Sequence, residues 1–146
     1  MSQFTNPLIL TLLEDKDGKA VLRDGIPLWK LDRQIIYDVG AEFSGESIRV
    51  PADFVTDLAS VPHPFRDWLP PNGPWNKAAV IHDFLFATSG TGVFNGYRYI
   101  DRLDPYTWQE ANHILYEAMG VLAVPEDKRH AIKLGLDIAQ GHGWGT

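Results

Sequence analysis

The spacing of hydrophobic and polar positions changes near the middle of the chain. In the first half, short apolar stretches alternate with turn-forming pairs such as Asp17-Gly18 and Asp24-Gly25, a pattern typical of β-hairpins. This pattern predicts strands over residues 8–13 and 20–22, one or two more within residues 28–31 and 35–39, and a short strand over 47–50. Residues 54–64 contain two prolines and several small polar residues, which predicts a structured loop because proline blocks a long helix.

The second half has the three- and four-residue apolar spacing of helices. We expect a first helix from about Pro74, a second from Asp104-Pro105 to about Met119, and a third from Pro125 to Gly141, because proline favours the first helical position and glycine the end. The glycine-rich residues 88–96 are interpreted as a loop. The sequence therefore predicts an α+β fold in one domain, with a small antiparallel sheet in the N-terminal half packed against three helices.

The first predicted helix contains an unusual pair of polar residues. In the stretch WNKAAVIHDFLF, at residues 75–86, His82 and Asp83 stand side by side in an apolar run. Ala78 and Ala79 share a face with His82 and would let a neighbouring helix approach closely. Ionisable groups in such a position are either paired in the core or used for chemistry.

Both interpretations of His82 and Asp83 remain open at this point. In the structural one, Asn112 or Tyr116, one turn apart on the second helix, binds the imidazole, and backbone amides of the preceding loop bind Asp83. In the functional one, His82 accepts a proton, since an imidazole near its ordinary pKa can do so at neutral pH.

The loop that precedes this helix supplies further candidates. Asp57 could join His82 and Asp83 to give one histidine and two carboxylates, a set that a Zn, Mn or Ca ion accepts. The alternative, which the sequence favours, is that Thr56, Asp57 and Ser60 form local turns with nearby backbone. Ser60 lacks the GxSxG context of a hydrolase nucleophile, so we do not expect it to be one.

Composition narrows the function classes. The 146 residues are 45% hydrophobic, which is enough for the chain to bury its own core. The formal net charge of -6 argues against nucleic acid as a partner, because such binding depends on lysine and arginine. The chain has no cysteine, so thiolate metal sites and disulfides are excluded. Residues 1–18 lack a basic segment before a short apolar run, and we expect neither a signal peptide nor a transmembrane segment.

Three sequence blocks resemble those of DUF1353, a family of small proteins common in bacteriophages and prophages. The blocks are FVTDLASVP at 54–62, AAVIHDFLF at 78–86, and the pair EAN at 110–112 and EAM at 117–119. The resemblance implies a phage context and no established activity. Family members often carry aspartate where this chain has Asn112 and tyrosine where it has Phe86.

The His-Asp helix also resembles that of phospholipase A2. This resemblance implies that His82 is the general base, that Asp83 binds calcium, and that Asn112 orients the imidazole from the opposing helix. Apart from this resemblance, Tyr116 and Ser60 are expected to support the site if His82 and Asp83 are functional.

Three classes of function follow from these observations. The first is a metal-assisted hydrolase that acts on a lipid, peptidoglycan or another ester or amide. The second is a non-enzymatic phage virion or assembly protein, and the third is a phage effector that binds a host protein or ligand. For all three we expect a location in the host cytoplasm or in the virion.

Overall fold

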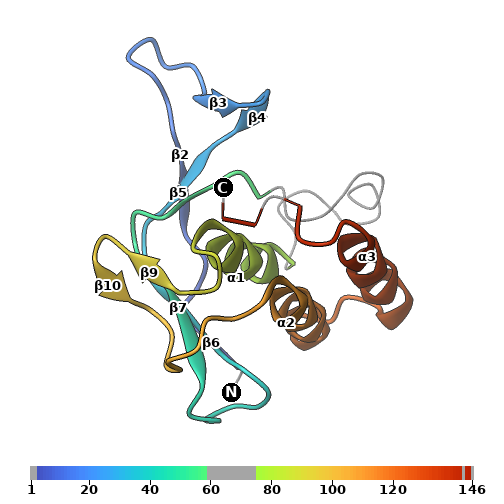
Figure 1. Cartoon of the computed structure of the whole chain (residues 1–146). Helices are drawn as coiled ribbons and strands as arrows, with labels where there is room; N and C mark the ends of the chain where they lie inside the picture. Colours follow the sequence, from blue (N-terminus) through green and yellow to red (C-terminus); the bar gives the residue numbers. More distant parts are fainter. Residues whose placement is uncertain (1–2, 59–74, 143, 146) are drawn as a thin grey trace.

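The computed structural model describes residues 3–58, 75–142 and 144–145 (Figure 1). Short strands occupy the N-terminal part and three helices dominate the C-terminal part of the described chain, which confirms the predicted α+β class. The elements are β1 Phe4–Thr5, β2 Leu10–Leu12, β3 Leu22–Arg23, β4 Ile26–Pro27, β5 Trp29–Leu31, β6 Ile35–Asp38, β7 Ser47–Val50, β8 Val55–Thr56, α1 Asn76–Ala87, β9 Val93–Phe94, β10 Tyr97–Arg98, α2 Trp108–Val121 and α3 Glu126–Ile138.

The strands form small antiparallel sheets. In one, β6 lies between β1 and β7, with Tyr37 opposite both Phe4 and Ile48. In another, β5 lies between β2 and β8, and the pairs β3–β4 and β9–β10 are hairpins. The predicted strand at 47–50 coincides with β7, and the predicted turn at Asp24-Gly25 connects β3 to β4.

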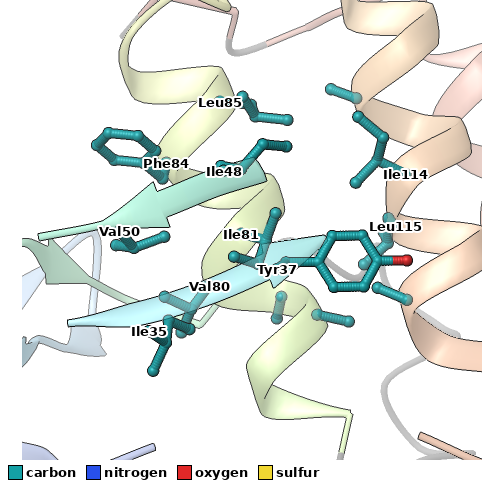
Figure 2. Close-up of a cluster of buried hydrophobic side chains, with 14 of the residues drawn as sticks. Ile35, Tyr37, Ile48, Val50, Val80, Ile81, Phe84, Leu85, Ile114 and Leu115 are labelled. Carbon is teal, nitrogen blue, oxygen red and sulfur yellow. The ribbon is translucent and has the colours of Figure 1, made fainter. Parts of the chain in front are cut away.

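Helix α1 lies between the sheet that contains β7 and helix α2, and α3 packs on the other side of α2 (Figure 1). Because both sides of α1 are covered, its sequence is apolar almost all round. Figure 2 shows the resulting core, in which side chains of β6 and β7 face those of α1 and α2. The residues labelled there are at most 3% exposed: Ile35, Tyr37, Ile48, Val50, Val80, Ile81, Phe84, Leu85, Ile114 and Leu115.

Burial of these side chains is the main source of stability for the arrangement. Each large apolar side chain contributes about 1.5 to 3 kcal/mol when it is fully removed from water. Ala78 and Ala79 of α1 and Ala111 and Ala118 of α2 are also fully buried, in agreement with the close helix packing that small residues predict. None of the helices in the described residues is long and apolar enough to cross a bilayer.

The start of α2 differs from the prediction. The helix begins at Trp108 rather than near Asp104-Pro105, and Thr107 is its N-cap. Thr107 and Glu110 form a capping box, in which each side chain accepts a hydrogen bond from the backbone N–H of the other residue, a device that satisfies free amides at a helix start.

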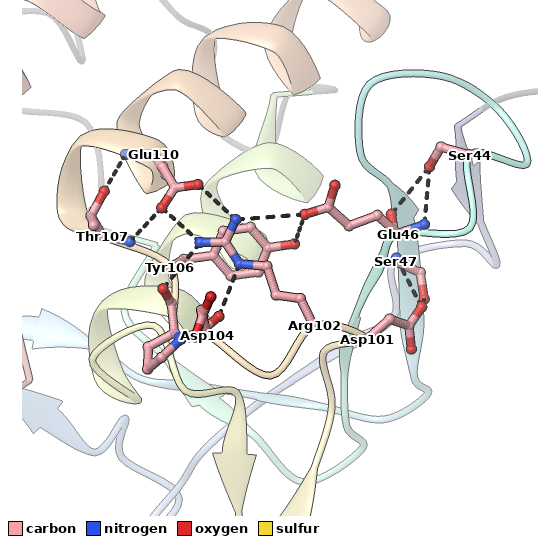
Figure 3. Close-up of polar contacts among 10 residues, drawn as sticks. Ser44, Glu46, Ser47, Asp101, Arg102, Asp104, Tyr106, Thr107 and Glu110 are labelled. Atoms are coloured by element: carbon pink, nitrogen blue, oxygen red, sulfur yellow. Dashed lines mark hydrogen bonds and ion pairs between the residues drawn. The ribbon is translucent and has the colours of Figure 1, made fainter.

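Arg102 explains why the chain is not helical earlier (Figure 3). Its guanidinium donates to the carbonyl oxygens of Asp104 and Pro105 at 2.9 and 3.0 Å. It also binds both carboxylate oxygens of Glu110 and lies over the ring of Tyr106. The carbonyls that a helix would use are therefore turned toward Arg102.

Two other boundaries also differ. The segment 88–96, interpreted as a loop, contains β9 and the turn into β10. Helix α3 ends at Ile138, before the predicted end at Gly141, which has a φ of +75°. Gly141 lies against the indole of Trp108, so its lack of a side chain also allows this close approach.

Candidate functional site

The candidate site is centred on a buried hydrogen bond between α1 and α2. The Nε2 atom of His82 lies 2.8 Å from Oδ1 of Asn112. Both side chains are almost fully buried, at 2% and 0% exposure. Of the two partners expected for His82 on the second helix, Asn112 and Tyr116, the structure has Asn112.

A carboxylate on α3 binds the other end of the Asn112 amide. Nδ2 of Asn112 donates to Oδ1 of Asp137 at 3.0 Å, and Nζ of Lys133 donates to Oδ2 of Asp137 at 2.7 Å. Burial raises the pKa of Asp137, but the bonds from Lys133 and Asn112 outweigh this effect and the pKa is lowered overall. The carboxylate that accepts from the Asn112 amide is therefore the ionised side chain of Asp137.

The imidazole of His82 is neutral at physiological pH. Burial lowers its pKa to about 4, and the bond with Asn112 opposes this only in part. Because Oδ1 of Asn112 can only accept, Nε2 of His82 is the protonated nitrogen and donates. Nδ1 then carries a lone pair; it is buried and has no hydrogen-bond partner in the part of the chain that the structure describes.

Aromatic side chains hold the plane of the imidazole. The ring of Phe86 lies 4.3 Å from that of His82, with an interplanar angle of 32°. Trp144 packs edge-on against Phe86 at 4.8 Å, and the backbone N–H of Gly145 donates to the carbonyl of Phe86. The C-terminal segment therefore covers the end of α1 and restricts the ring stack.

Asp83 is bound by the strand that precedes the undescribed segment. Its Oδ2 accepts a hydrogen bond from the hydroxyl of Thr56 in β8, and the same hydroxyl accepts from the backbone N–H of Leu58 at 3.0 Å. The second bond is the local turn expected around this position. One partner of Asp83 is thus a side-chain hydroxyl, whereas its expected bonds to backbone amides of the preceding loop stay a prediction, because most of that loop lies outside the described residues.

The other predicted metal ligand has a different partner. Asp57 forms an ion pair with Arg23, with 3.6 Å between Oδ2 and Nη2. Within the described ranges, no group of three histidine, aspartate or glutamate side chains has a geometry that could hold a metal ion. Ser60, the supporting residue expected in this loop, lies outside the described residues.

Tyr116 does not face α1 as expected. Its ring lies under the guanidinium of Arg129, at 4.5 Å, and beside the imidazole of His130, at 5.2 Å, both on α3. Residues four apart on a helix differ by about 40° in direction, and α2 packs against both neighbouring helices. Asn112 consequently reaches both α1 and α3, whereas the ring of Tyr116 contacts side chains of α3.

A second polar cluster joins α2 to the sheet. The carboxylate oxygen Oε1 of Glu117 accepts from the hydroxyl of Tyr37, from Gly40 N at 2.8 Å, and from Gln3 Nε2 at 3.3 Å. Burial and the bond to Glu117 raise the pKa of Tyr37. This oxygen has three donors, so the cluster is best explained as a structural link.

Sequence reasoning missed Asp137 and Lys133. Their i,i+4 spacing predicts a pair on one helical face, but a carboxylate and an ammonium so spaced are common on exposed helices. The link to Asn112 depends on the register between α2 and α3, which no local pattern in the sequence reports.

Comparison with known proteins places the chain in a family. Residues 29–135 match the model of the family described as "Protein of unknown function (DUF1353)", which covers most of the chain. The protein belongs to the DUF1353 family. No curated protein and no solved structure shows significant similarity to it.

Proposed function

We propose that the protein is a hydrolase in which His82 acts as general base through Nδ1. The imidazole would take a proton from a water molecule whose oxygen attacks the carbonyl carbon of an ester or amide. The proton would then pass to the leaving group as the bond to it breaks. This role uses the two nitrogens differently, with Nε2 for orientation and Nδ1 for chemistry.

The observation that carries the proposal is that Nδ1 of His82 is buried and has no hydrogen-bond partner among the described residues. Buried polar atoms nearly always have a hydrogen-bond partner, and exceptions call for an explanation such as a catalytic role or a bound water. Here the ring is neutral, its plane is held by Phe86, and its other nitrogen is bound to Asn112. A fixed, neutral imidazole with one lone pair can accept a proton, but its lowered pKa makes it a weaker base than an ordinary imidazole, so the proposal rests on the position of Nδ1 and not on its basicity.

A divalent metal ion, Ca, Zn or Mn, is a separate part of the proposal. Asp83 and Asp57 would hold it, and it would stabilise negative charge on the carbonyl oxygen. The described residues do not by themselves form such a site, because Asp57 is paired with Arg23 and Asp83 with Thr56. No step of the proton transfer above depends on the ion.

The substrate classes to test are phospholipids, peptidoglycan and small esters or amides. The purified protein would be incubated with phospholipid vesicles, isolated sacculi and chromogenic esters and anilides, each with Ca, Zn, Mn or a chelator. His82→Gln is the matched control, because the glutamine amide can still donate to Asn112 from about the position of Nε2 but offers no imidazole base.

The expected result is product release from one substrate class, with a rate about 100-fold lower in His82→Gln, the lower end of what a general base contributes. A dependence on one metal would support the carboxylate site, and equal rates with chelator would remove the metal from the proposal. If His82→Gln and the wild-type protein release equal product from every class, the hydrolase proposal is wrong.

A non-enzymatic phage protein is the second candidate. Three large apolar side chains, Phe43, Tyr97 and Leu103, are 80%, 70% and 85% exposed, and exposed apolar groups are common where proteins bind partners. The partner would be a virion component or a host protein. Mass spectrometry of purified phage particles tests the first, and co-purification from host cells tests the second; finding the chain in neither would exclude this candidate.

A further inference from the structure

We propose that Asp137 is a positioning residue that sets the tautomer of His82 from a third helix, by fixing the orientation of the Asn112 amide between them. The inference concerns which nitrogen of His82 is free, and its catalytic meaning rests on the proposed function above. The tautomer itself can be measured whether or not the protein is an enzyme.

The argument starts from the two ends of the Asn112 side chain. A carboxamide has an oxygen that only accepts and a nitrogen that only donates. It could therefore face His82 in either of two orientations, related by a rotation of about 180°. One orientation requires a proton on Nε2 of His82, and the other requires a lone pair there.

Asp137 removes this choice. An ionised carboxylate can only accept, so the amide nitrogen must turn toward it, as the 3.0 Å contact between Nδ2 of Asn112 and Oδ1 of Asp137 records. Oδ1 of Asn112 is then left to face Nε2 of His82, at 2.8 Å. A neutral imidazole has one N–H, so the other nitrogen, Nδ1, carries the free lone pair.

Lys133 has a different part in the chain of contacts. Its ammonium binds the other oxygen, Oδ2, of Asp137 and, within the described part of the chain, forms no hydrogen bond with the amide of Asn112 or the imidazole of His82. It therefore favours the ionised form of Asp137 without defining the direction of the amide. Lys133→Met is therefore a control, because it keeps Asp137 as the acceptor of the Asn112 amide and removes only the cation beside that carboxylate.

The test is a long-range ¹H–¹⁵N spectrum of the histidine ring nitrogens, recorded at one pH near 7 on wild type and variants. In Asp137→Ala we expect the clear separation between a protonated Nε2 and an unprotonated Nδ1 to be lost, with both resonances moving toward an average. Asp137→Asn, which keeps the shape, should behave similarly, because an amide at 137 can pair with either orientation of Asn112. Lys133→Met should retain the wild-type pattern.

A rescue variant separates positioning from general damage to the fold. Asn112→Asp combined with Asp137→Ala keeps the number of carboxylates, and an aspartate at 112 can only accept from His82. We expect this double variant to restore the wild-type ring pattern that Asp137→Ala loses. The proposal is overturned if Asp137→Ala or Asp137→Asn keeps the wild-type pattern, if the double variant does not restore it, or if Lys133→Met disturbs it equally. None of these outcomes depends on hydrolysis, so they are distinct from a failure of the proposed function.

Discussion

His82 of α1 and Asn112 of α2 form a hydrogen bond, 2.8 Å between Nε2 and Oδ1, between two side chains that are almost completely removed from water. Such a bond is costly to break on one side only, because the remaining partner stays buried without one. The stability of the helix pair and the state of the imidazole therefore depend on the same contact.

Asn112→Leu is expected to destabilise the protein. Leucine has a similar size but cannot accept the proton of His82 Nε2, so a buried donor loses its partner at a cost of about 1 to 3 kcal/mol. Urea unfolding followed by circular dichroism measures the change. Gln109→Leu, at an exposed position of the same helix, is the control and should change stability by no more than about 0.5 kcal/mol. Equal effects of the two substitutions would contradict the importance of the buried bond.

The stability of the protein should fall as the pH is lowered from about 7 to 4. The pKa of His82 is about 4 in the folded protein and near 6.5 when unfolded, so between these values the unfolded chain binds a proton that the folded one does not. The contribution of neutral His82 to the free energy of unfolding is complete well above pH 6.5 and is lost on acidification, by roughly 3 kcal/mol in all.

His82→Gln isolates this contribution from that of other titrating groups. As the pH falls from 7 to 4, the unfolding free energy of the wild type should decrease more than that of His82→Gln. If the two proteins show parallel pH dependences from 7 to 4, His82 is not held neutral by burial.

The start of α2 was not predictable from local signals, because Asp104-Pro105 and Thr107 with Glu110 are both acceptable helix beginnings. Arg102 decides between them by binding the carbonyls of Asp104 and Pro105. By contrast, β7 and the first turn of α3 were predictable, since Pro51 and Pro125 mark their limits in the sequence itself.

Within the site, the sequence was informative about the contact between His82 and the second helix, but not about the contact between Asn112 and Asp137. His82 was expected to meet Asn112 or Tyr116, because small residues beside His82 allow close approach of the second helix and these two polar residues lie one turn apart on it. Tyr116 was assigned to the same face, although a direction that differs by about 40° is enough to turn it toward α3. Asp137 was not identified, because its contact depends on how α2 and α3 are aligned.

Arg102→Met should show how much the contacts of Arg102 with Glu110 and Tyr106 contribute to the free energy of unfolding. The substitution removes the paired bonds to Glu110 and the cation over the ring of Tyr106. We expect a loss of about 1 to 3 kcal/mol in denaturant unfolding, since hydrogen bonds to charged groups lie in this range. Arg102→Lys should recover less than half, because lysine lacks the planar fork.

The exposed Arg33 provides the control for Arg102. It lies on the surface, so Arg33→Met should change the unfolding free energy by less than about 0.5 kcal/mol. A loss for Arg102→Met no larger than that for Arg33→Met would show that the contacts of Figure 3 do not stabilise the protein.

Gly90 and Gly96 differ in a way that separates backbone strain from close packing. Both have positive φ, at +77° and +83°, but a Cβ on Gly90 would lie 1.9 Å from the carbonyl oxygen of Tyr106, whereas nothing lies within 4 Å at Gly96. Gly96→Ala should cost about 1 to 2 kcal/mol from backbone strain alone. Gly90→Ala should cost several kcal/mol more in thermal or urea unfolding, and equal losses would argue against the close approach of Gly90 and Tyr106.

The most direct test of the central claim is the ¹⁵N spectrum of His82 in the wild-type protein at pH 7. The claim is that this buried imidazole is neutral, with a proton on Nε2 and a free lone pair on Nδ1. We predict that Nε2 resonates as a protonated nitrogen and Nδ1 as an unprotonated one. A proton on Nδ1, or an imidazolium with both nitrogens protonated at this pH, would contradict the account.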